Sequence, residues 1–562
     1  MAVTRLWGVP ARMRDGVALN TDVYLPSEGV DGGPYPGVLL RTAYSNQGAP
    51  DVEMAAHLAG HGYAVALQDV RGRYGSEGEF RPFRNEGPDG YDAIEWVAAQ
   101  PWCTGRIGTM GISYEGSAQW LAAREGPPHL VTMVSTAAAG RWMQELPFDR
   151  GVLMLVVLPW LHAVSGRVGR QPWLIPDLPE VLRGLPVRTL DERLGISLPV
   201  WREWLEHPTL DEYWRALLLD ADAFRRIDLP VLHITGWYDD DQPGALFFHE
   251  GMCAHSPRAA DQHLVVGPWD HGGTRTPAQS LGGVDFGPAA LEDIADLHRR
   301  WFDHWLKPGA PGPWPEPRAR VFLGATNQWR TAGAWPPRDC EPRLLYLRGG
   351  GRANTLAGDG RLDPQPPAAP EPADTFVYDP ADPVASDVDP RFYAPDQTET
   401  PLDERFKHRR DDVLVYTSAP LEETLVVAGT PVVHLFAATD GPDTDWFAAL
   451  HDVAATGASM LLAAGRLRAR FADGLEREVP LEPGVAREFV VELGAVGHCL
   501  RPGHRVRLTV TSSDFPRWER NPNTGEPIAT SVALRAATNR VCHEPDRPSR
   551  VVLPISPAEL AC

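Results

Sequence analysis

The chain has 562 residues and is 43% hydrophobic, so it is long enough to fold as two or three globular domains and too apolar to be disordered. Its formal charge is −21, with nearly all of the positive charge on arginine, and such an acidic surface excludes nucleic acid as an expected partner because it repels phosphate backbones. The six cysteines include no C-x-x-C pair, which favours reduced thiols over a disulfide framework or a zinc site.

No segment has the composition of a signal peptide or a membrane helix. Residues 1–7 lack an apolar run. The longest apolar stretch, residues 152–161, contains Pro159 and is far shorter than the ~20 residues that a membrane helix needs, so we predict a buried helix there. These features predict a soluble, cytoplasmic protein with no membrane partner.

The first third of the chain alternates short apolar strands with helical segments, a pattern typical of a mainly parallel sheet covered on both faces. The predicted strands are residues 17–24, 37–40, 63–67, 105–112 and 130–135, and the first of them is expected to be antiparallel. The predicted helices are residues 52–59, a segment ending near Pro101, and residues 114–124. This order favours an α/β-hydrolase-like fold.

The junction between the strand 105–112 and the helix 114–124 resembles the G-x-S-x-G nucleophile elbow. It reads Gly111-Ile112-Ser113-Tyr114-Glu115-Gly116. Glycines leave room for a sharp turn that pushes the Ser113 hydroxyl above the sheet. We therefore predict that Ser113 is a catalytic serine, with an ordinary strand-to-helix turn as the alternative.

After residue 140 the alternation stops. Residues 142–214 hold six of the nineteen tryptophans, several prolines and patches of helical spacing, without a clean strand. We predict a mostly helical cap over residues 141–225, in which Trp142 and Trp160 are candidates for the pocket lining. Filling of the cap's own core is an equally good explanation for any single tryptophan.

The sheet then resumes. Strands are predicted at residues 230–235, 262–266 and 319–323, with a long amphipathic helix whose stripe comprises Leu291, Ile294, Leu297, Trp301 and Trp305. From about residue 336 the hydrophobic period changes to two, which favours an all-β sandwich, plausibly a jelly roll. Its strands are expected at residues 413–416, 432–436, 447–453, 489–493, 505–510 and 551–555. Residues 349–405 are predicted to form an irregular surface connection.

The predicted domains follow from these changes of pattern. They are a first part of the α/β-hydrolase domain (1–140), the helical cap (141–225), a second part of the hydrolase domain (226–335) and the C-terminal jelly-roll sandwich (336–562).

A serine nucleophile needs a base, which a carboxylate must orient. In α/β-hydrolases the chain order is nucleophile, acid, histidine. Here Ser113 is followed by three consecutive aspartates, 239–241, after the strand 230–235, and by His271 after the strand 262–266. On local grounds the acid could be any of the three. The zincin pattern fails at His249-Glu250, because the residue four positions after His249 is Cys253.

Several motifs resemble the cocaine esterase and X-prolyl dipeptidyl-peptidase family of serine hydrolases. They are the opening Arg14-Asp15-Gly16-Val17-Ala18-Leu19, the segment 68–80, the elbow, Gly236-Trp237-Tyr238-Asp239, Gly267-Pro268-Trp269-Asp270-His271 and the segment 513–525. The resemblance spans almost the whole chain. It implies that Asp239 is the triad carboxylate and that the Tyr114 N–H and the Tyr44 hydroxyl form the oxyanion hole. Arg71, Glu77 and the segment 514–525 are expected to be structural.

The expected function is therefore hydrolysis of a small-molecule ester or amide through an acyl-enzyme, which requires no metal or organic cofactor. The alternatives are an X-Pro dipeptidyl-peptidase, for which Glu145 and Asp149 could recognise a peptide N-terminus, and an α-amino-acid ester hydrolase. A non-catalytic binding protein that uses the jelly roll is more remote. The expected partners are a small-molecule ester or amide substrate and, as an alternative to a monomer, further copies of the same chain.

Overall fold

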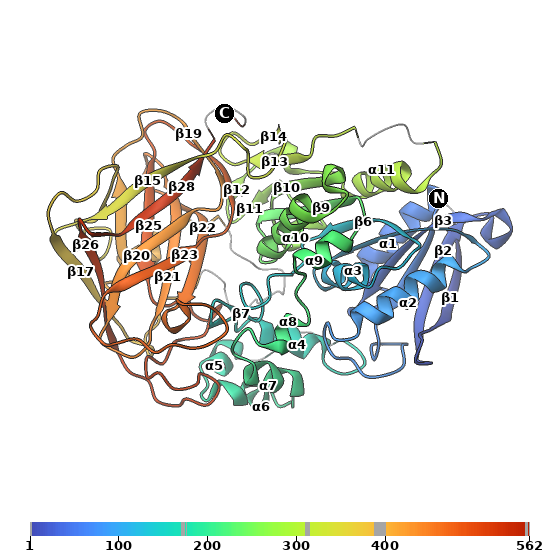
Figure 1. The fold of residues 1–562 in the computed structure, drawn as a ribbon, viewed down its shortest axis with the longest axis horizontal. Coiled ribbons are helices and arrows are strands. Elements are labelled where there is room, and N and C mark those ends of the chain that lie inside the picture. The colour runs from blue at the N-terminus through green and yellow to red at the C-terminus, as the bar shows by residue number, and fades with distance from the viewer. Residues whose placement is uncertain are drawn as a thin grey trace.

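The computed structural model describes residues 3–169, 175, 177–309, 315–386, 401–556 and 560. A mixed α/β region and an all-β region lie side by side, and a group of short helices lies below and between them in the view of Figure 1. The chain thus has the two-part architecture predicted from its change of hydrophobic period, with an all-β C-terminal part.

The α/β region is built on a ten-stranded sheet of order β1-β2-β4-β3-β5-β6-β9-β10-β13-β14. The strands from β4 to β13 in that order pair in parallel, whereas β1, β2 and β14 pair antiparallel at the two edges. All the strands predicted for this region are confirmed, and β1 and β14 are additional. Their bounds are β1 Val3–Arg12, β2 Ala18–Pro26, β3 Tyr35–Thr42, β4 Ala64–Asp69, β5 Cys103–Ile112, β6 Leu130–Thr136, β9 Val231–Tyr238, β10 Gln262–Asp270, β13 Ala319–Leu323 and β14 Gln328–Ala332.

Helices cover both faces of this sheet. One apolar cluster joins α1 (Ala49–Gly60) and α11 (Ile294–Leu306) to the strands, and another joins α2 (Glu86–Ala98), α3 (Tyr114–Arg124) and α10 (Gln242–His255) to the opposite side. Leu291, expected on the stripe of α11, instead precedes the helix and is 53% exposed. The helix begins later because the Asp293 carboxylate accepts a hydrogen bond from the Asp296 N–H (2.9 Å) and so caps it.

The chain between β6 and β9 is mostly helical, but its first part differs from the prediction. Two short strands, β7 (Phe148–Asp149) and β8 (Val152–Leu153), form a hairpin, so the helix predicted over residues 152–161 begins at Val157. Pro159 is tolerated because it lies in the first turn, where an N–H has no helical partner. Of the tryptophans counted here, Trp173 lies outside the described residues. The helices are α4 Val157–Val164, α5 Leu178–Leu182, α6 Leu190–Arg193, α7 Pro199–Glu206, α8 Glu212–Arg215 and α9 Ala221–Arg226.

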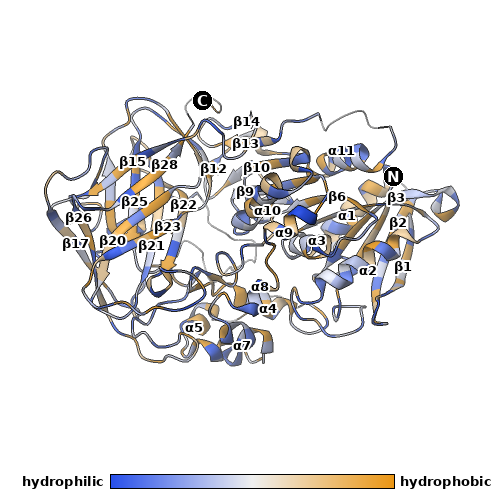
Figure 2. Cartoon of the chain, viewed as in Figure 1, coloured by the Kyte–Doolittle hydropathy of each residue, from blue (hydrophilic) through white to orange (hydrophobic). Residues whose placement is uncertain are grey.

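The described residues of the all-β region form fourteen strands around one apolar core. In Figure 2 its strands carry many hydrophobic residues, as expected for sheets that bury one face. The six predicted strands are confirmed. The bounds are β15 Glu341–Arg348, β16 Arg361–Asp363, β17 Glu371–Tyr378, β18 Leu414–Ser418, β19 Leu425–Gly429, β20 Val432–Thr439, β21 Asp445–Val453, β22 Ser459–Arg468, β23 Arg487–Glu492, β24 Val496–Leu500, β25 Arg505–Thr511, β26 Ala537–Glu544, β27 Arg547–Pro548 and β28 Arg550–Ile555.

Two expectations are wrong in this half of the chain. Residues 349–405 are not all irregular, because β16 and β17 join the sheet; β17 is an end strand beside β26, where its proline and exposed polar side chains cost little. The expectation of reduced thiols fails at Cys499, which is disulfide-bonded, while among the described residues Cys103, Cys253, Cys340 and Cys542 form no disulfide. Residues 387–400 lie outside the described part of the chain. Within that part, no helix has the length and apolar character needed to cross a membrane.

Candidate active site

Ser113 stands at the tip of the turn between β5 and α3. Its backbone has φ 62° and ψ −126°, a strained conformation for a residue other than glycine. The Ser113 N–H donates to the backbone carbonyls of Thr136 (3.1 Å) and Ala137 (3.0 Å) at the end of β6, and these bonds hold the turn in place. Such a turn at the carboxyl end of a central strand is the geometry of a nucleophile elbow.

The glycines on either side of Ser113 are needed for space. A Cβ on Gly111 would lie 2.5 Å from the Glu115 Cβ, and one on Gly116 would lie 2.8 Å from the Thr136 carbonyl oxygen. The local sequence departs from strict G-x-S-x-G, because Glu115 occupies the place of the second glycine and Gly116 follows it. Glu115 is buried, and its carboxylate accepts from the Ile112 N–H (3.3 Å), which braces the elbow from within.

His271 and Asp239 meet at the same edge of the sheet. Asp239 follows β9 and His271 follows β10, and the distance between His271 Nδ1 and Asp239 Oδ1 is 2.8 Å. The Thr235 hydroxyl donates to the second Asp239 oxygen (2.8 Å), which fixes the carboxylate. Of the neighbouring aspartates, Asp241 lies 3.9 Å from the same ring nitrogen, and Asp240 pairs with Arg517 instead. The geometry of the imidazole therefore favours Asp239 among the three.

Tyr44 lies beyond the end of β3 and contacts the serine. Its hydroxyl accepts a hydrogen bond from Trp160 Nε1 (3.1 Å) and also bonds the Ser113 side chain. Burial raises the pKa of Tyr44 above its ordinary value, and the bonds to Trp160 and Ser113 oppose this rise only in part. The phenol therefore stays protonated at neutral pH and keeps a proton to donate.

Tyr114 follows the serine directly, and its backbone N–H and its hydroxyl lie in different surroundings. It is the first residue of α3, where an N–H has no helical partner. Its hydroxyl points away and donates to Glu86 Oε1 (2.7 Å), whose other oxygen lies 2.6 Å from Arg41 Nη1. This buried chain of side chains anchors the start of α3 to α2 and β3.

Ser113 and His271 line one cavity of about 80 Å³. Trp160 is part of its wall, whereas Trp142 is buried behind it and packs against Phe83 with ring centroids 4.7 Å apart. Most of the other walls are apolar side chains that sequence reasoning did not select: Phe83, Leu146, Met154, Val156, Val157 and Trp204. Two signals pointed toward some of them: Trp204 shares a helical spacing with Trp201 and Leu205, and Met154, Val156 and Val157 belong to the apolar stretch 152–161.

A second, larger cavity of about 440 Å³ adjoins the first, and Met154 and Asp240 line both. Its walls come from α10, from the residues after β6 and from the all-β region. Glu145 and Asp149 lie there, but their carboxylates are engaged. Glu145 accepts from the backbone N–H groups of residues 140, 141 and 244 (2.8–3.0 Å), and Asp149 lies 3.0 Å from Arg466 Nη1.

Two further motif residues have the structural role expected of them. Arg71 pairs with Asp89 (2.6 Å) and Asp15 (2.8 Å), and Glu77 accepts from the Ala18 N–H (2.9 Å). Both brace the loop after β4 and lie outside the walls of the small cavity.

The site has a strained serine on an elbow of a mainly parallel sheet, and a histidine that bonds a carboxylate lines the same cavity. This combination places the chain among α/β-hydrolase-like serine enzymes. Two sequence-family models match the chain. The model of the family X-Pro dipeptidyl-peptidase (S15 family) matches residues 15–273, and the model of the X-Pro dipeptidyl-peptidase C-terminal non-catalytic domain matches residues 313–552. The chain belongs to this family, which includes a cocaine esterase of Rhodococcus sp. (strain MB1 Bresler) that is 32% identical over 97% of both chains.

Two solved structures are similar over nearly the whole length. One is an aminopeptidase from the marine sediment archaeon Thaumarchaeota archaeon, and the other is an α-amino acid ester hydrolase. Each has a TM-score of 0.87 and 29% identity, and the match covers 98% of this chain and 96% of the other. The relatives thus include enzymes named for esters and for peptides.

Proposed function

We propose that this protein is a serine hydrolase that cleaves a small-molecule ester or amide, with Ser113 as nucleophile, His271 as general base and Asp239 as the orienting acid. One observation carries the proposal: the strained Ser113 shares a cavity with His271, and His271 Nδ1 lies 2.8 Å from Asp239 Oδ1. The match to a family of esterases and peptidases supports the same class of reaction.

In the proposed mechanism, His271 takes the proton of Ser113 as the hydroxyl attacks the carbonyl carbon. Asp239 holds the imidazole in the tautomer whose Nε2 can accept that proton. The Tyr44 hydroxyl and the Tyr114 N–H would donate to the oxyanion of the tetrahedral intermediate. His271 then returns the proton to the leaving group, and water releases the acyl group by the same steps in reverse.

The parts of the chain take separate roles in this proposal. Residues 141–225 act as a helical cap that roofs the cavity, and residues 336–562 form a jelly roll that closes the site from the side; residues 1–140 and 226–335 together form the hydrolase domain. Support comes from the cavity walls, since Met154, Trp160 and Trp204 come from the first segment and Arg517 and Trp518 of the larger cavity from the second.

The shape of the two cavities suggests which part of a substrate each receives. The small cavity is mainly apolar and aromatic, so it suits a small apolar acyl group, and the larger one, with its charged walls, suits a polar leaving group. Peptidase or amino-acid ester activity is the second candidate. Such activity needs carboxylates that can bind an ammonium group. Glu145 and Asp149 are poor candidates for this role, because other groups already engage their carboxylates.

The test is covalent labelling with a fluorophosphonate, followed by a substrate panel. The wild-type protein should be labelled at Ser113, and Ser113→Ala should not be labelled. Short-chain aryl esters should then be turned over faster than X-Pro anilides or α-amino acyl esters, with Ser113→Ala as the blank. A wild-type protein that the probe leaves unmodified would refute the mechanism, and a preference for X-Pro anilides would favour the peptidase.

A further inference from the structure

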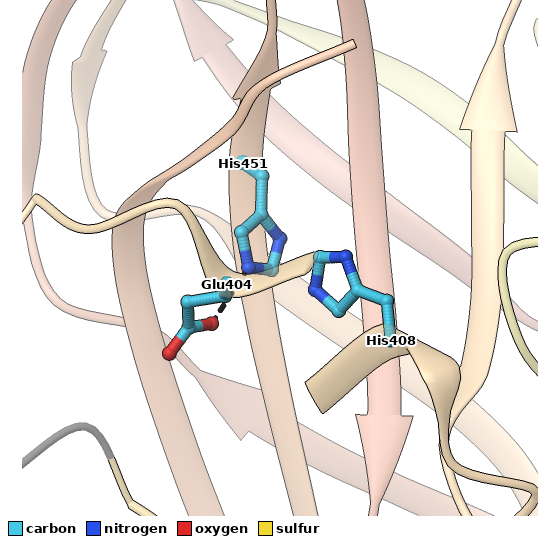
Figure 3. Close-up of side chains that lie close together, drawn as sticks. All are labelled: Glu404, His408 and His451. Atoms are coloured by element: carbon cyan, nitrogen blue, oxygen red, sulfur yellow. Dashed lines mark hydrogen bonds and ion pairs between the residues drawn. The ribbon is translucent and has the colours of Figure 1, made fainter. Parts of the chain in front are cut away.

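A cluster of side chains that could bind a metal ion lies inside the all-β region, apart from the residues assigned to catalysis. It consists of Glu404, His408 and His451, and one donor atom from each lies within 4.8 Å of the others (Figure 3). Glu404 and His408 are four residues apart on the 3₁₀ helix η8 (Glu404–Arg409), and His451 comes from β21. Figure 3 shows the three side chains converging from these two elements.

His408 has no hydrogen-bond partner that would explain its position. Its side chain is buried, with 1% of the residue exposed, and within the described part of the chain neither ring nitrogen has a partner. An imidazole buried without a partner costs stability, so such a group calls for an explanation.

We propose that this cluster binds a divalent transition-metal ion of the zinc type, held by a carboxylate oxygen of Glu404, Nε2 of His451 and a ring nitrogen of His408. Two imidazoles and one carboxylate are a donor set that zinc accepts, whereas calcium and magnesium prefer oxygen alone. His451 Nε2 already lies 2.8 Å from Glu404 Oε2. Tetrahedral zinc holds its donors about 3.3 Å apart, so these two atoms need to move little.

The groups around the cluster fit an ion of this charge. Lys407 Nζ lies 2.5 Å from Glu404 Oε1, the oxygen that does not face His451, and 3.1 Å from Asp514 Oδ1. A carboxylate that binds a metal is commonly held through its other oxygen in this way. Asp514 offsets the charge of Lys407, and Arg507 is a further cation near His408 that a bound ion would have to tolerate.

The site would be structural, since nothing in it belongs to the proposed catalytic machinery. The ion would join η8 to β21. Through the ion pair of Lys407 with Asp514 it would also hold the loop 513–525, whose Arg517 contacts Asp240 beside the proposed triad acid.

The test uses the full-length protein stripped of metal with a chelator and then titrated with Zn²⁺, with bound metal and thermal unfolding as readouts. We expect the wild type to bind one equivalent that both His408→Gln and His451→Gln lose, and to unfold at a higher temperature with zinc than without it. The matched control is His434→Gln, which changes a partly exposed histidine of the same region that pairs with Glu488. It should keep the equivalent and the shift.

Co²⁺ gives a readout that needs no variant, because the wild type should develop the visible absorption of a tetrahedral cobalt site with nitrogen and oxygen ligands. The proposal is overturned if the stripped wild type binds no zinc, or if His408→Gln keeps the same stoichiometry and the same rise in unfolding temperature. Circular dichroism of both variants in chelator shows whether they are folded. If neither folds, a wild type without the tetrahedral cobalt spectrum overturns the proposal by itself.

Discussion

At the scale of single residues, Tyr44 and Tyr114 offer different groups to the same oxyanion in the proposed mechanism. The protonated Tyr44 hydroxyl bonds the Ser113 side chain, whereas the Tyr114 hydroxyl donates to Glu86. In the proposal, Tyr114 therefore contributes its backbone N–H. If the proposal holds, the two phenols differ in role, with a catalytic hydrogen bond from Tyr44 and a structural one from Tyr114, in side chains of equal size.

Tyr44→Phe should lower kcat about 10²–10³-fold with little change in KM, because it removes a donor that acts in the transition state. Tyr114→Phe should keep kcat within a few-fold and lower the stability by about 1–3 kcal/mol, because it leaves a buried Glu86 oxygen without a partner. Steady-state kinetics and thermal unfolding of both variants measure this contrast. Equal losses of kcat would remove Tyr44 from the proposed oxyanion hole.

The raised pKa of Asp241 leads to a prediction of how the stability of the protein depends on pH. Burial, with the charge of Asp239, raises the pKa of Asp241 to about 8, although His271 pulls it down. The folded protein then keeps this carboxyl protonated where the unfolded chain has lost the proton, so the group lowers stability as pH rises from about 4 to about 8. Asp241→Asn removes that loss.

The variant should therefore gain stability over the wild type, by about 1 kcal/mol or more at pH 8 and by less at pH 5. Denaturant unfolding at the two pH values measures the difference. A gain that is larger at pH 5 than at pH 8 would show that Asp241 is ionised in the folded protein at neutral pH.

At the scale of elements, the loop 513–525 connects the all-β region to the proposed active site. The Leu155 N–H donates to the Arg517 carbonyl (3.0 Å), and the Glu519 N–H donates to the Leu153 carbonyl (2.9 Å). The Arg517 guanidinium, only 3% exposed, pairs with Asp240 next to the proposed triad acid. The loop thus supports both the cavity wall around Met154 and the turn after β9.

Arg517→Met should lower kcat/KM by about tenfold and stability by about 2–3 kcal/mol, because the largely buried carboxylate of Asp240 loses its Arg517 partner. Adding Asp240→Asn should restore part of the stability, since it removes the carboxylate that has lost its Arg517 partner. The matched control is Arg535→Met, whose pair with Asp440 is exposed and should contribute less than about 1 kcal/mol. If Arg517→Met behaved like this control, the loop would not support the site.

The elements also show where reading the sequence succeeded. Strands that are buried along most of their length, such as β9 and β10, contain short runs of apolar residues, and they were predicted because that pattern needs no knowledge of neighbours. β17 was missed because it is an end strand in a segment rich in proline and aspartate. The hairpin of β7 and β8 was missed because its apolar residues fit a helix equally well until their pairing partners are known.

At the scale of the whole molecule, the small cavity is assembled from chain segments far apart in the sequence. Ser113, His271 and Trp160 come from an elbow, a loop after β10 and the helix α4, and they meet because parallel strands end at one edge of the sheet and the helical segment folds over it. The adjoining larger cavity also needs the all-β region. A substrate of this enzyme would therefore contact all parts of the chain.

The sequence was enough to predict a mixed α/β region followed by an all-β region, the family, and the chain order of Ser113, Asp239 and His271. These features depend on local hydrophobic period, on turn residues and on motifs that are short and contiguous. The folded chain was needed to see that Glu145 and Asp149 are engaged by other groups and that His408 lies beside Glu404 and His451. Without the family resemblance it was also needed to choose among the three aspartates, of which Asp239 bonds His271. These outcomes depend on the directions of side chains from separate elements, which hydrophobic period and turn residues do not encode.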